Sequence, residues 1–167
     1  CKEAIEEKGG MTHALVSYHK PSVFGDDLVW DIIHQTALLR YLCGEPSRIM
    51  SRVGRYFGDQ ENSFHAIIEF ENGSTGILNC FRASGARYEA VEMHGQRIGA
   101  YIMPPHWAKI YEPEGTRLLE TSKIGVFHEI FGYKDEVTYF LDCVRQDRPV
   151  EINGIDEAVS NMKLIKS

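Results

Sequence analysis

The chain has 167 residues, of which 25% are charged and 43% hydrophobic, and its formal net charge is -6. These values are typical of one soluble globular domain with a sizeable core. Net acidity and scattered basic residues argue against a nucleic-acid partner, and no apolar run approaches the roughly 20 residues that a bilayer-spanning helix needs. We expect a cytoplasmic protein with no membrane partner.

The first part of the chain predicts two helices with a strand between them. In chain order, the helix, strand and helix cover residues 2–8, 11–20 and 28–43. Glycines end both helices, and Pro21 stops the strand. Asp26 or Asp27 can cap the second helix, which is nearly all apolar.

A run of short strands follows, bounded by turn residues. We expect these strands at about residues 47–58, 63–70, 74–81, 87–95, 100–103, 108–113 and 117–122. The strongest hairpin signal is Glu71-Asn72-Gly73, because Asn-Gly accepts the positive φ angles of a type I′ turn. Arg82 and Arg87 are expected to decorate strand ends, and neither is a candidate anion site.

Two amphipathic helices close the chain. In residues 136–147 the apolar side chains recur at i, i+3, i+4 and i+7, as Val137, Phe140, Leu141 and Val144. A last helix carries the same kind of stripe, made by Ile155, Ala158, Val159, Met162 and Ile165.

This order of elements predicts an α+β domain with one broad, open, mostly antiparallel sheet that helices cover on one face. We expect the uncovered face to mediate self-association, so the protein should be a homo-oligomer. The residues that could line that face, depending on register, are Phe64, Ile68, Phe70, Ile77, Tyr88 and Val91.

Cysteine and histidine spacing excludes a metal site. The four cysteines are far apart and form no Cys-x-x-Cys pair: Cys1, Cys43, Cys80 and Cys143. Three of them lie in apolar runs, which indicates buried free thiols in a reducing compartment. His13 and His19 on one strand would be about 20 Å apart, too far to share a metal ion. Because the chain begins at Cys1 within helix formers, we expect it to be a piece of a longer protein.

The helix over residues 28–43 carries the main candidate chemistry. Asp31 and His34 are three residues apart and therefore share one face of the helix. A histidine can take or give a proton near neutral pH, and a neighbouring carboxylate can orient its ring. The pair can thus act as a proton shuttle. The alternative interpretation is a partly buried histidine hydrogen-bonded to an acid that caps the helix.

The stretch from Asp31 through His34 to Gly44 resembles the helix that opens the C-terminal domain of the Gfo/Idh/MocA oxidoreductases, the relatives of glucose-fructose oxidoreductase and inositol dehydrogenase. Four further motifs continue the resemblance over essentially the whole chain: IIEFENGSTGIL, EMHGQRIGAYI, YFLDCVRQDRP and IDEAVSNMKLIKS. The resemblance implies an open-sheet α+β fold similar to the C-terminal domain of glyceraldehyde-3-phosphate dehydrogenase.

The resemblance also implies a parent enzyme in which an N-terminal Rossmann domain binds NAD or NADP. Residues 1–167 would then be a single C-terminal domain that supplies the substrate pocket and the oligomeric sheet. The chain has no Gly-x-Gly-x-x-Gly between a strand and a helix. Its Glu7-Lys8-Gly9 does not match the Glu-Lys-Pro motif that holds the family's active-site lysine. We therefore expect this chain alone to bind neither NAD nor NADP and to be inactive.

His34 falls on the family's active-site histidine, which takes the hydroxyl proton while a hydride leaves the carbinol carbon. The family often has an acid four residues before this histidine and another three residues after it, where this chain has Trp30 and Ala37. Asp31 can stand in for the first acid. The resemblance thus implies that His34 and Asp31 are catalytic.

The substrate that the resemblance implies is a sugar, inositol or related polyol. Trp30, beside the catalytic pair, is a candidate substrate-binding residue. His19 and Lys20 are further candidates, because they end the first strand and could face a cleft between domains. A solvated strand end is the alternative for these two residues.

Two functions remain open at this point. The first is the substrate and oligomerisation domain of an NAD(P)-dependent dehydrogenase, which Asp31 and His34 favour. The second is a non-catalytic association or scaffold domain of the same fold, for which Trp30 and Ala37 leave room.

Overall fold

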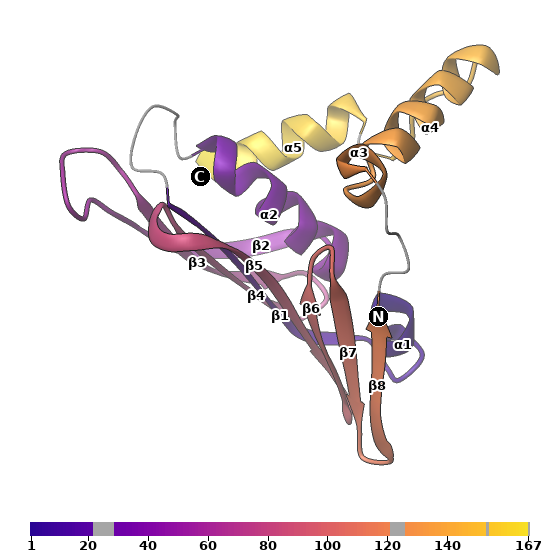
Figure 1. The fold of residues 1–167 in the computed structure, drawn as a ribbon, viewed down its shortest axis with the longest axis horizontal. Coiled ribbons are helices and arrows are strands. Elements are labelled where there is room, and N and C mark those ends of the chain that lie inside the picture. Colours follow the sequence, from indigo (N-terminus) through magenta and orange to yellow (C-terminus); the bar gives the residue numbers. More distant parts are fainter. Residues whose placement is uncertain (22–28, 121–125, 153, 167) are drawn as a thin grey trace.

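The computed structural model of the chain describes residues 1–21, 29–120, 126–152 and 154–166. Figure 1 shows a broad sheet with helices on one side of it. The helices are α1 (Lys2–Glu6), α2 (Val29–Cys43), α3 (Phe127–Ile130), α4 (Tyr133–Arg145) and α5 (Ile155–Lys166). The expected capping of α2 by Asp26 or Asp27 lies outside the described residues. Within the described segments, no helix is long and apolar enough to span a bilayer.

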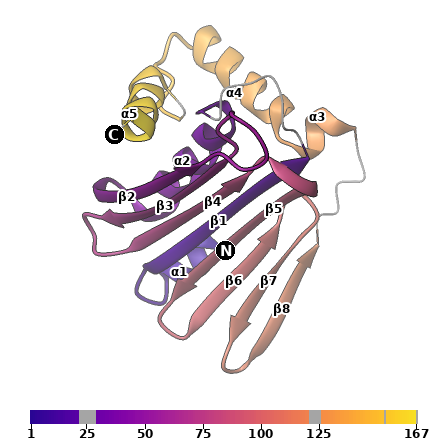
Figure 2. The same ribbon diagram turned by 90° about the vertical axis from the view of Figure 1, so that its left-hand side faces the viewer.

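The sheet has eight strands in the order β2-β3-β4-β1-β5-β6-β7-β8 (Figure 2). The strands are β1 (Met11–Pro21), β2 (Pro46–Gly54), β3 (Ser63–Phe70), β4 (Thr75–Phe81), β5 (Ala83–Gly95), β6 (Ile98–Met103), β7 (Trp107–Glu112) and β8 (Gly115–Glu120). Neighbouring strands are antiparallel, except that β1 and β4 are parallel. The predicted α+β class with a broad, mostly antiparallel sheet is therefore confirmed.

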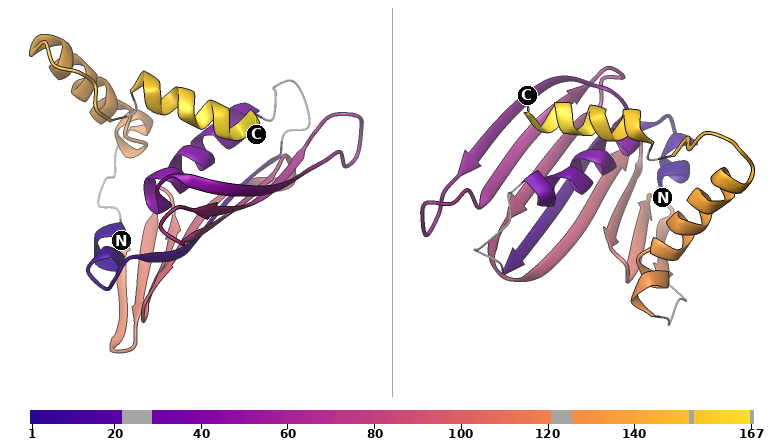
Figure 3. Two further views of the ribbon diagram at one scale, coloured as in Figure 1. Left: turned by 180° about the vertical axis from the view of Figure 1, so that it is seen from behind. Right: turned by 90° about the horizontal axis from the view of Figure 1, so that it is seen from above.

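The position of β1 differs from a simple meander, because β1 is inserted at the centre of the sheet. It pairs with β4 on one side and with β5 on the other, so that Val16 lies opposite Leu78 and Val91. Helix α2 then carries the chain from this central strand to β2 at the edge (Figure 3). The residues of β1 thus lie in the middle of the domain, directly beneath α2.

Helices α2, α5 and α1 cover one face of the sheet. Helix α2 packs on β1 and β4, α5 packs on α2, and α1 lies against β5 and β1. Fully buried side chains in this layer come from α2, β4 and β5, among them Leu39, Leu78 and Met93. Helices α3 and α4 instead stand away from the sheet (Figures 1 and 3).

Burial along the strands corrects part of the expected open face. In β3, Ile68 and Phe70 are buried and Phe64 packs against the same core, so these residues face the helices. Val91 of β5 is buried there too. The placement was wrong for these four residues because a one-residue difference in register exchanges the two faces of a strand.

The open face instead carries the alternate residues of each strand. Ile77 and Tyr88 do lie on it, as expected, together with Ile67, which pairs with Ile77. These apolar residues share the face with aromatic and polar side chains, including Tyr101 and Glu92. The open face is therefore mixed in character and not uniformly apolar.

The β3–β4 hairpin forms where the sequence predicts it, but its turn type differs from the prediction. Residues 71–74 form a four-residue loop in which Gly73 has a φ of 84°, while Asn72 has no positive φ. The Asn72 Oδ1 atom accepts hydrogen bonds from the backbone N (3.0 Å) and the Oγ (2.6 Å) of Ser74. The type I′ prediction was wrong, because Asn72 uses its side chain to bond within the loop.

Gly95 of β5 lies in close contact with α1, so a substitution at Gly95 tests how tightly these two elements pack. A Cβ atom at Gly95 would lie 2.8 Å from the Gly10 carbonyl oxygen and 2.8 Å from the Ile5 side chain. We expect Gly95→Ala to lower the free energy of unfolding by about 1–3 kcal/mol, the usual cost of overpacking. Gly85→Ala on the same strand is the control, because nothing lies within 4 Å of that Cβ position. Urea unfolding of both variants measures the difference, and equal losses of stability would contradict the packing described here.

Candidate active site

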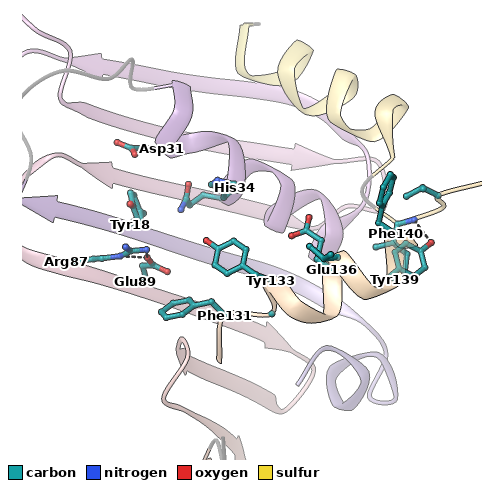
Figure 4. Close-up of a pocket in the computed structure, with 15 residues that line it drawn as sticks. Tyr18, Asp31, His34, Arg87, Glu89, Phe131, Tyr133, Glu136, Tyr139 and Phe140 are labelled. Atoms are coloured by element: carbon teal, nitrogen blue, oxygen red, sulfur yellow. Dashed lines mark hydrogen bonds and ion pairs between the residues drawn. The ribbon is translucent and has the colours of Figure 1, made fainter. Parts of the chain in front are cut away.

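A pocket of about 1070 Å³ lies between the sheet, α2 and the segment that contains α3 and α4. Figure 4 shows polar side chains from the sheet and α2 on one side, and Phe131 with aromatic side chains of α4 on the other. The polar lining includes Tyr18, Asp31, His34, Gln35, Arg87 and Glu89, and the aromatic lining includes Phe131, Tyr133, Tyr139 and Phe140. A ligand in this pocket would meet hydrogen-bonding groups on one wall and rings on the other.

His34 projects from α2 into this pocket, and its side chain is exposed (Figure 4). The structure places it one turn after the start of α2, as the sequence predicts. Its ring makes no hydrogen bond to any other residue that the structure describes. Its ring nitrogens are therefore free to bond with a ligand hydroxyl.

Asp31 binds two cations and makes no hydrogen bond to the His34 ring. Lys20 Nζ donates a hydrogen bond to Asp31 Oδ1 at 2.7 Å, and Arg82 Nε lies 2.5 Å from Asp31 Oδ2 in an ionic contact. Asp31 is 8% exposed and Arg82 5%. The structure therefore gives the Asp31 carboxylate a different partner from the expected one: it holds the first turn of α2 against the ends of β1 and β4.

Arg82 was not identified as a site residue from the sequence: it lies at a strand end, as expected, but it is buried and paired with Asp31. It lies between β4 and β5, where its backbone N–H donates to the Asn62 carbonyl oxygen at 2.8 Å. Its guanidinium turns inward because the Asp31 carboxylate lies there. The sequence contains no signal for the Asp31–Arg82 ion pair, because the two residues are far apart in the chain and only the fold brings them together.

The thiol next to this ionic cluster is inert. Burial, and then the negative charge of Asp31, raise the pKa of Cys80 to about 12, although Arg82 and Lys20 oppose the shift. At neutral pH this cysteine is therefore a protonated core residue. All four cysteines are free thiols, and Cys43, Cys80 and Cys143 are buried, which confirms the prediction for these three.

The sheet wall of the pocket is formed by Tyr18, Arg87 and Glu89. Arg87 donates to Glu89 Oε1 from Nε (2.8 Å) and Nη2 (2.5 Å), and its guanidinium lies 5.8 Å from the centre of the Tyr18 ring. Burial, and then Asp31, raise the pKa of Tyr18, so its phenol stays neutral at physiological pH. A neutral phenol can both donate and accept a hydrogen bond.

Gln35 adds a further polar group to the pocket. Its Oε1 atom is buried and has no hydrogen-bond partner among the residues that the structure describes. A buried polar atom without a partner costs free energy, which a bound hydroxyl group could recover. Tyr18, His34 and Gln35 together therefore suit a ligand that carries several hydroxyl groups.

The other candidate substrate-binding residues lie elsewhere. His19 is on the open face of the sheet, where its ring stacks on Tyr88 with centroids 5.8 Å apart. Lys20 faces α2 but is bound to Asp31. The side chain of Trp30 lies outside the described part of the structure. In the described parts of the chain, no group of three or more His, Cys, Asp or Glu side chains could hold a metal ion.

Solved structures of dehydrogenases share the fold of this chain. The chain superposes on the dehydrogenase MviM from Clostridium difficile with a TM-score of 0.85 and 16% identity, over 99% of this chain and 56% of that one. It superposes on the UDP-N-acetylglucosamine 3-dehydrogenase GnnA from Acidithiobacillus ferrooxidans with a TM-score of 0.80 and 17% identity, over 98% of this chain and 55% of that one. It superposes on levoglucosan dehydrogenase in complex with NADH and L-sorbose with a TM-score of 0.79 and 16% identity, over 97% of this chain and 57% of that one.

At these identities the likeness shows a shared fold, and the chain spans little more than half the length of these relatives. Comparison with curated proteins finds no match. The profile of the GFO/IDH/MocA C-terminal domain matches residues 9–100, which is more than half of the chain. The chain therefore belongs to the GFO/IDH/MocA C-terminal domain family, as the resemblance of its motifs predicts.

Removal of Arg82 tests the buried ionic cluster. We expect Arg82→Met to lower the free energy of unfolding by about 3–5 kcal/mol, because loss of one partner leaves a buried carboxylate poorly compensated. Arg87→Met is the matched control, since the Arg87–Glu89 pair is exposed and such pairs contribute at most about 1 kcal/mol. Urea unfolding compares the two, and a small effect of both substitutions would show that the cluster does not anchor α2.

Proposed function

We propose that residues 1–167 are the substrate-binding and oligomerisation domain of an NAD(P)-dependent dehydrogenase that oxidises a sugar, inositol or related polyol. The longer protein that contains it is called the parent protein. The observation that carries the proposal is His34, a free imidazole directed into a pocket with Tyr18 and Gln35 on its polar wall. The dehydrogenases that share the fold support it, since one is complexed with NADH and L-sorbose and another acts on a nucleotide sugar.

In the proposed reaction a secondary alcohol becomes a carbonyl. NAD or NADP, bound by an N-terminal Rossmann domain of the parent protein, supplies the hydride acceptor. His34 takes the proton of the reacting hydroxyl, while Tyr18 and Gln35 orient neighbouring hydroxyls. Phe131 and Tyr133 cover the C–H face of the ring, as aromatic side chains commonly do for sugars. The free buried thiols suit a reducing, cytoplasmic compartment.

One observation favours a second candidate function, a non-catalytic association or scaffold domain. The carboxylate that was expected to orient His34 is bound by Lys20 and Arg82. Ala37 cannot replace it, because its side chain has no polar group. If neither the substrate nor the rest of the parent protein orients the His34 ring, the domain would serve association alone.

The pH dependence of turnover in the parent protein distinguishes the two functions. We expect His34→Asn to reduce turnover by roughly 10²–10⁴-fold, because asparagine keeps hydrogen bonding but cannot act as the base. The acidic limb of the pH profile should also disappear, while thermal melting stays unchanged. His106→Asn, an exposed loop residue away from the pocket, is the control. Near-normal turnover with an unchanged pH profile would support the scaffold function.

We further propose that the domain forms a homo-oligomer through the open face of the sheet (Figure 2). Eight strands about 4.8 Å apart and roughly 20 Å long give a face of about 700 Å², close to the roughly 800 Å² that each partner buries in a stable interface. Met50, Ile67 and Tyr111 are large apolar side chains exposed on this face.

A charge placed on this face should prevent association. We expect the chain to elute as an oligomer in size exclusion with light scattering and Ile67→Lys to elute as a monomer of about 19 kDa. Leu119→Lys is the control, because Leu119 is equally exposed but lies on the opposite face of β8. A monomeric wild type at high micromolar concentration would contradict the proposal.

The open face also predicts how association depends on pH. The His13 and His94 rings stack with centroids 4.4 Å apart, and burial, followed by His94, lowers the pKa of His13 although Glu92 opposes this. A second copy on this face would bury the two rings further, so protonation of His13 would disfavour the associated state. Association should therefore be complete above the ordinary histidine pKa of about 6.5 and weaken as the pH falls toward 5.5. Light scattering across this range measures it, with His13→Gln expected to flatten the response.

A further inference from the structure

Three carboxylates line the pocket, and their bonding differs: Asp31, Glu89 and Glu136. Asp31 is bound by two cations, and Glu89 accepts hydrogen bonds from Nε and Nη2 of Arg87. Glu136, in the first turn of α4, makes no ion pair and no side-chain hydrogen bond with any residue that the structure describes. A ligand in the pocket would therefore meet one carboxylate that this part of the chain does not compensate.

Glu136 lies on the side of α4 that faces α2 (Figure 4). Residues three and four positions away along a helix are its neighbours on the helix surface. For Glu136 these neighbours all line the pocket as well: Gly132, Tyr133, Tyr139 and Phe140. None of them is basic, and Lys134 of the same turn is bound by Glu129 at 2.9 Å. Helix α4 thus offers this carboxylate rings and no cation.

The aromatic surroundings of Glu136 suit a positively charged ligand. The face of an aromatic ring carries partial negative charge and attracts ammonium and guanidinium groups. Two rings of the pocket already have such contacts within the chain. The Arg87 guanidinium lies 5.8 Å from the centre of the Tyr18 ring. The Arg148 guanidinium lies 5.2 Å from the centre of the Tyr139 ring.

The apolar stripe of α4 borders the same carboxylate. Its four residues are between 42% and 62% exposed: Val137, Phe140, Leu141 and Val144. Val137 and Phe140 line the pocket together with Glu136. A ligand seated there would exclude water from part of the surroundings of Glu136, and a pair of opposite charges attracts more strongly where water is excluded.

The basic side chains at the sheet wall are already bonded to groups of the chain itself. Arg87 is held by Glu89, and Lys20 and Arg82 are held by Asp31. A phosphate or carboxylate group on a ligand would have to displace one of these charge-assisted pairs. The pocket therefore disfavours an anionic ligand.

The polar groups that await a partner on this side of the pocket are acceptors. The buried Oε1 atom of Gln35 has no partner among the described residues, and the ionised Glu136 carboxylate can only accept. An ammonium group has three N–H donors and no acceptor, so it complements such groups better than a hydroxyl group does.

We propose that the substrate is a polyol that carries a protonated amine, such as an amino sugar or an aminocyclitol, and that Glu136 binds its ammonium group. This inference rests on the proposed function, because it takes the reaction at the His34 pocket as given. The amine keeps its protons throughout. The carbinol carbon elsewhere on the ring still loses its hydride to the nicotinamide, and its hydroxyl proton goes to His34.

Turnover of matched substrates by the parent protein tests the charge preference. Glucosamine and glucose form one pair, and an aminodeoxyinositol and myo-inositol form a second. At pH 7, where most of the amine is protonated, we expect kcat/KM to be at least about 10-fold higher for the amine of one pair than for its neutral partner. Glucose 6-phosphate should be a poorer substrate than glucose.

Substitution of Glu136 identifies the residue responsible. We expect Glu136→Gln to lower kcat/KM for the preferred amine at least about 10-fold and to leave the neutral partner within about 2-fold. Asp135→Asn is the matched control, because it removes the same charge from the same first turn of α4 but does not line the pocket. It therefore reproduces any loss of interaction with the helix dipole. Thermal melting checks that both variants stay folded.

The same measurements separate this inference from the proposed function. If neutral polyols or glucose 6-phosphate are oxidised as well as the amines, the ammonium assignment is wrong and the proposed function stands. The same conclusion follows if Glu136→Gln lowers kcat/KM equally for both members of a pair. If the parent protein oxidises none of these compounds, both the inference and the proposed function are contradicted.

Discussion

The Asp31 carboxylate is the point at which the central strand, the β4–β5 connection and the main helix are tied together. Lys20 comes from the end of β1, Arg82 from between β4 and β5, and Asp31 from the first turn of α2. Loss of either cation would leave the buried carboxylate poorly compensated and would strongly destabilise the fold. The start of α2 is thereby fixed over the sheet, and His34, one turn later, is directed into the pocket.

The two faces of the sheet suit two different functions. The helix side contains the pocket, where the free His34 ring, the neutral Tyr18 phenol and the unpartnered Gln35 amide oxygen suit a polyhydroxylated ligand. The open side contains mixed aromatic, apolar and histidine side chains in an array that suits association. Since alternate residues of each strand face opposite sides, one strand can serve both tasks: Tyr18 of β1 lines the pocket, whereas His19 stacks on Tyr88.

Features set by local spacing could be predicted from the sequence. The bounds of α2, the β3–β4 hairpin and the exposure of His34 toward a site follow from helix periodicity, turn residues and the family motif. Features that depend on distant partners could not: Arg82 reads as a strand-end charge, and β1 is inserted between β4 and β5. The stripe of α4 was predicted correctly, yet its exposure was not, because periodicity identifies an apolar face without saying what covers it.

The central claim is that the Asp31 cluster positions His34 in a polyol-binding pocket. Histidine-selective NMR of the 167-residue chain, titrated with myo-inositol and with glucose at millimolar concentration, tests it most directly. The ring resonance of His34 is assigned by its absence from His34→Asn. The account predicts that this resonance shifts on addition of a polyol. It also predicts that Asp31→Asn loses this shift, while the rest of its spectrum remains that of a folded protein. Shifts at His13 or His19 with an unmoved His34 resonance, or an unchanged His34 response in Asp31→Asn, would contradict the account.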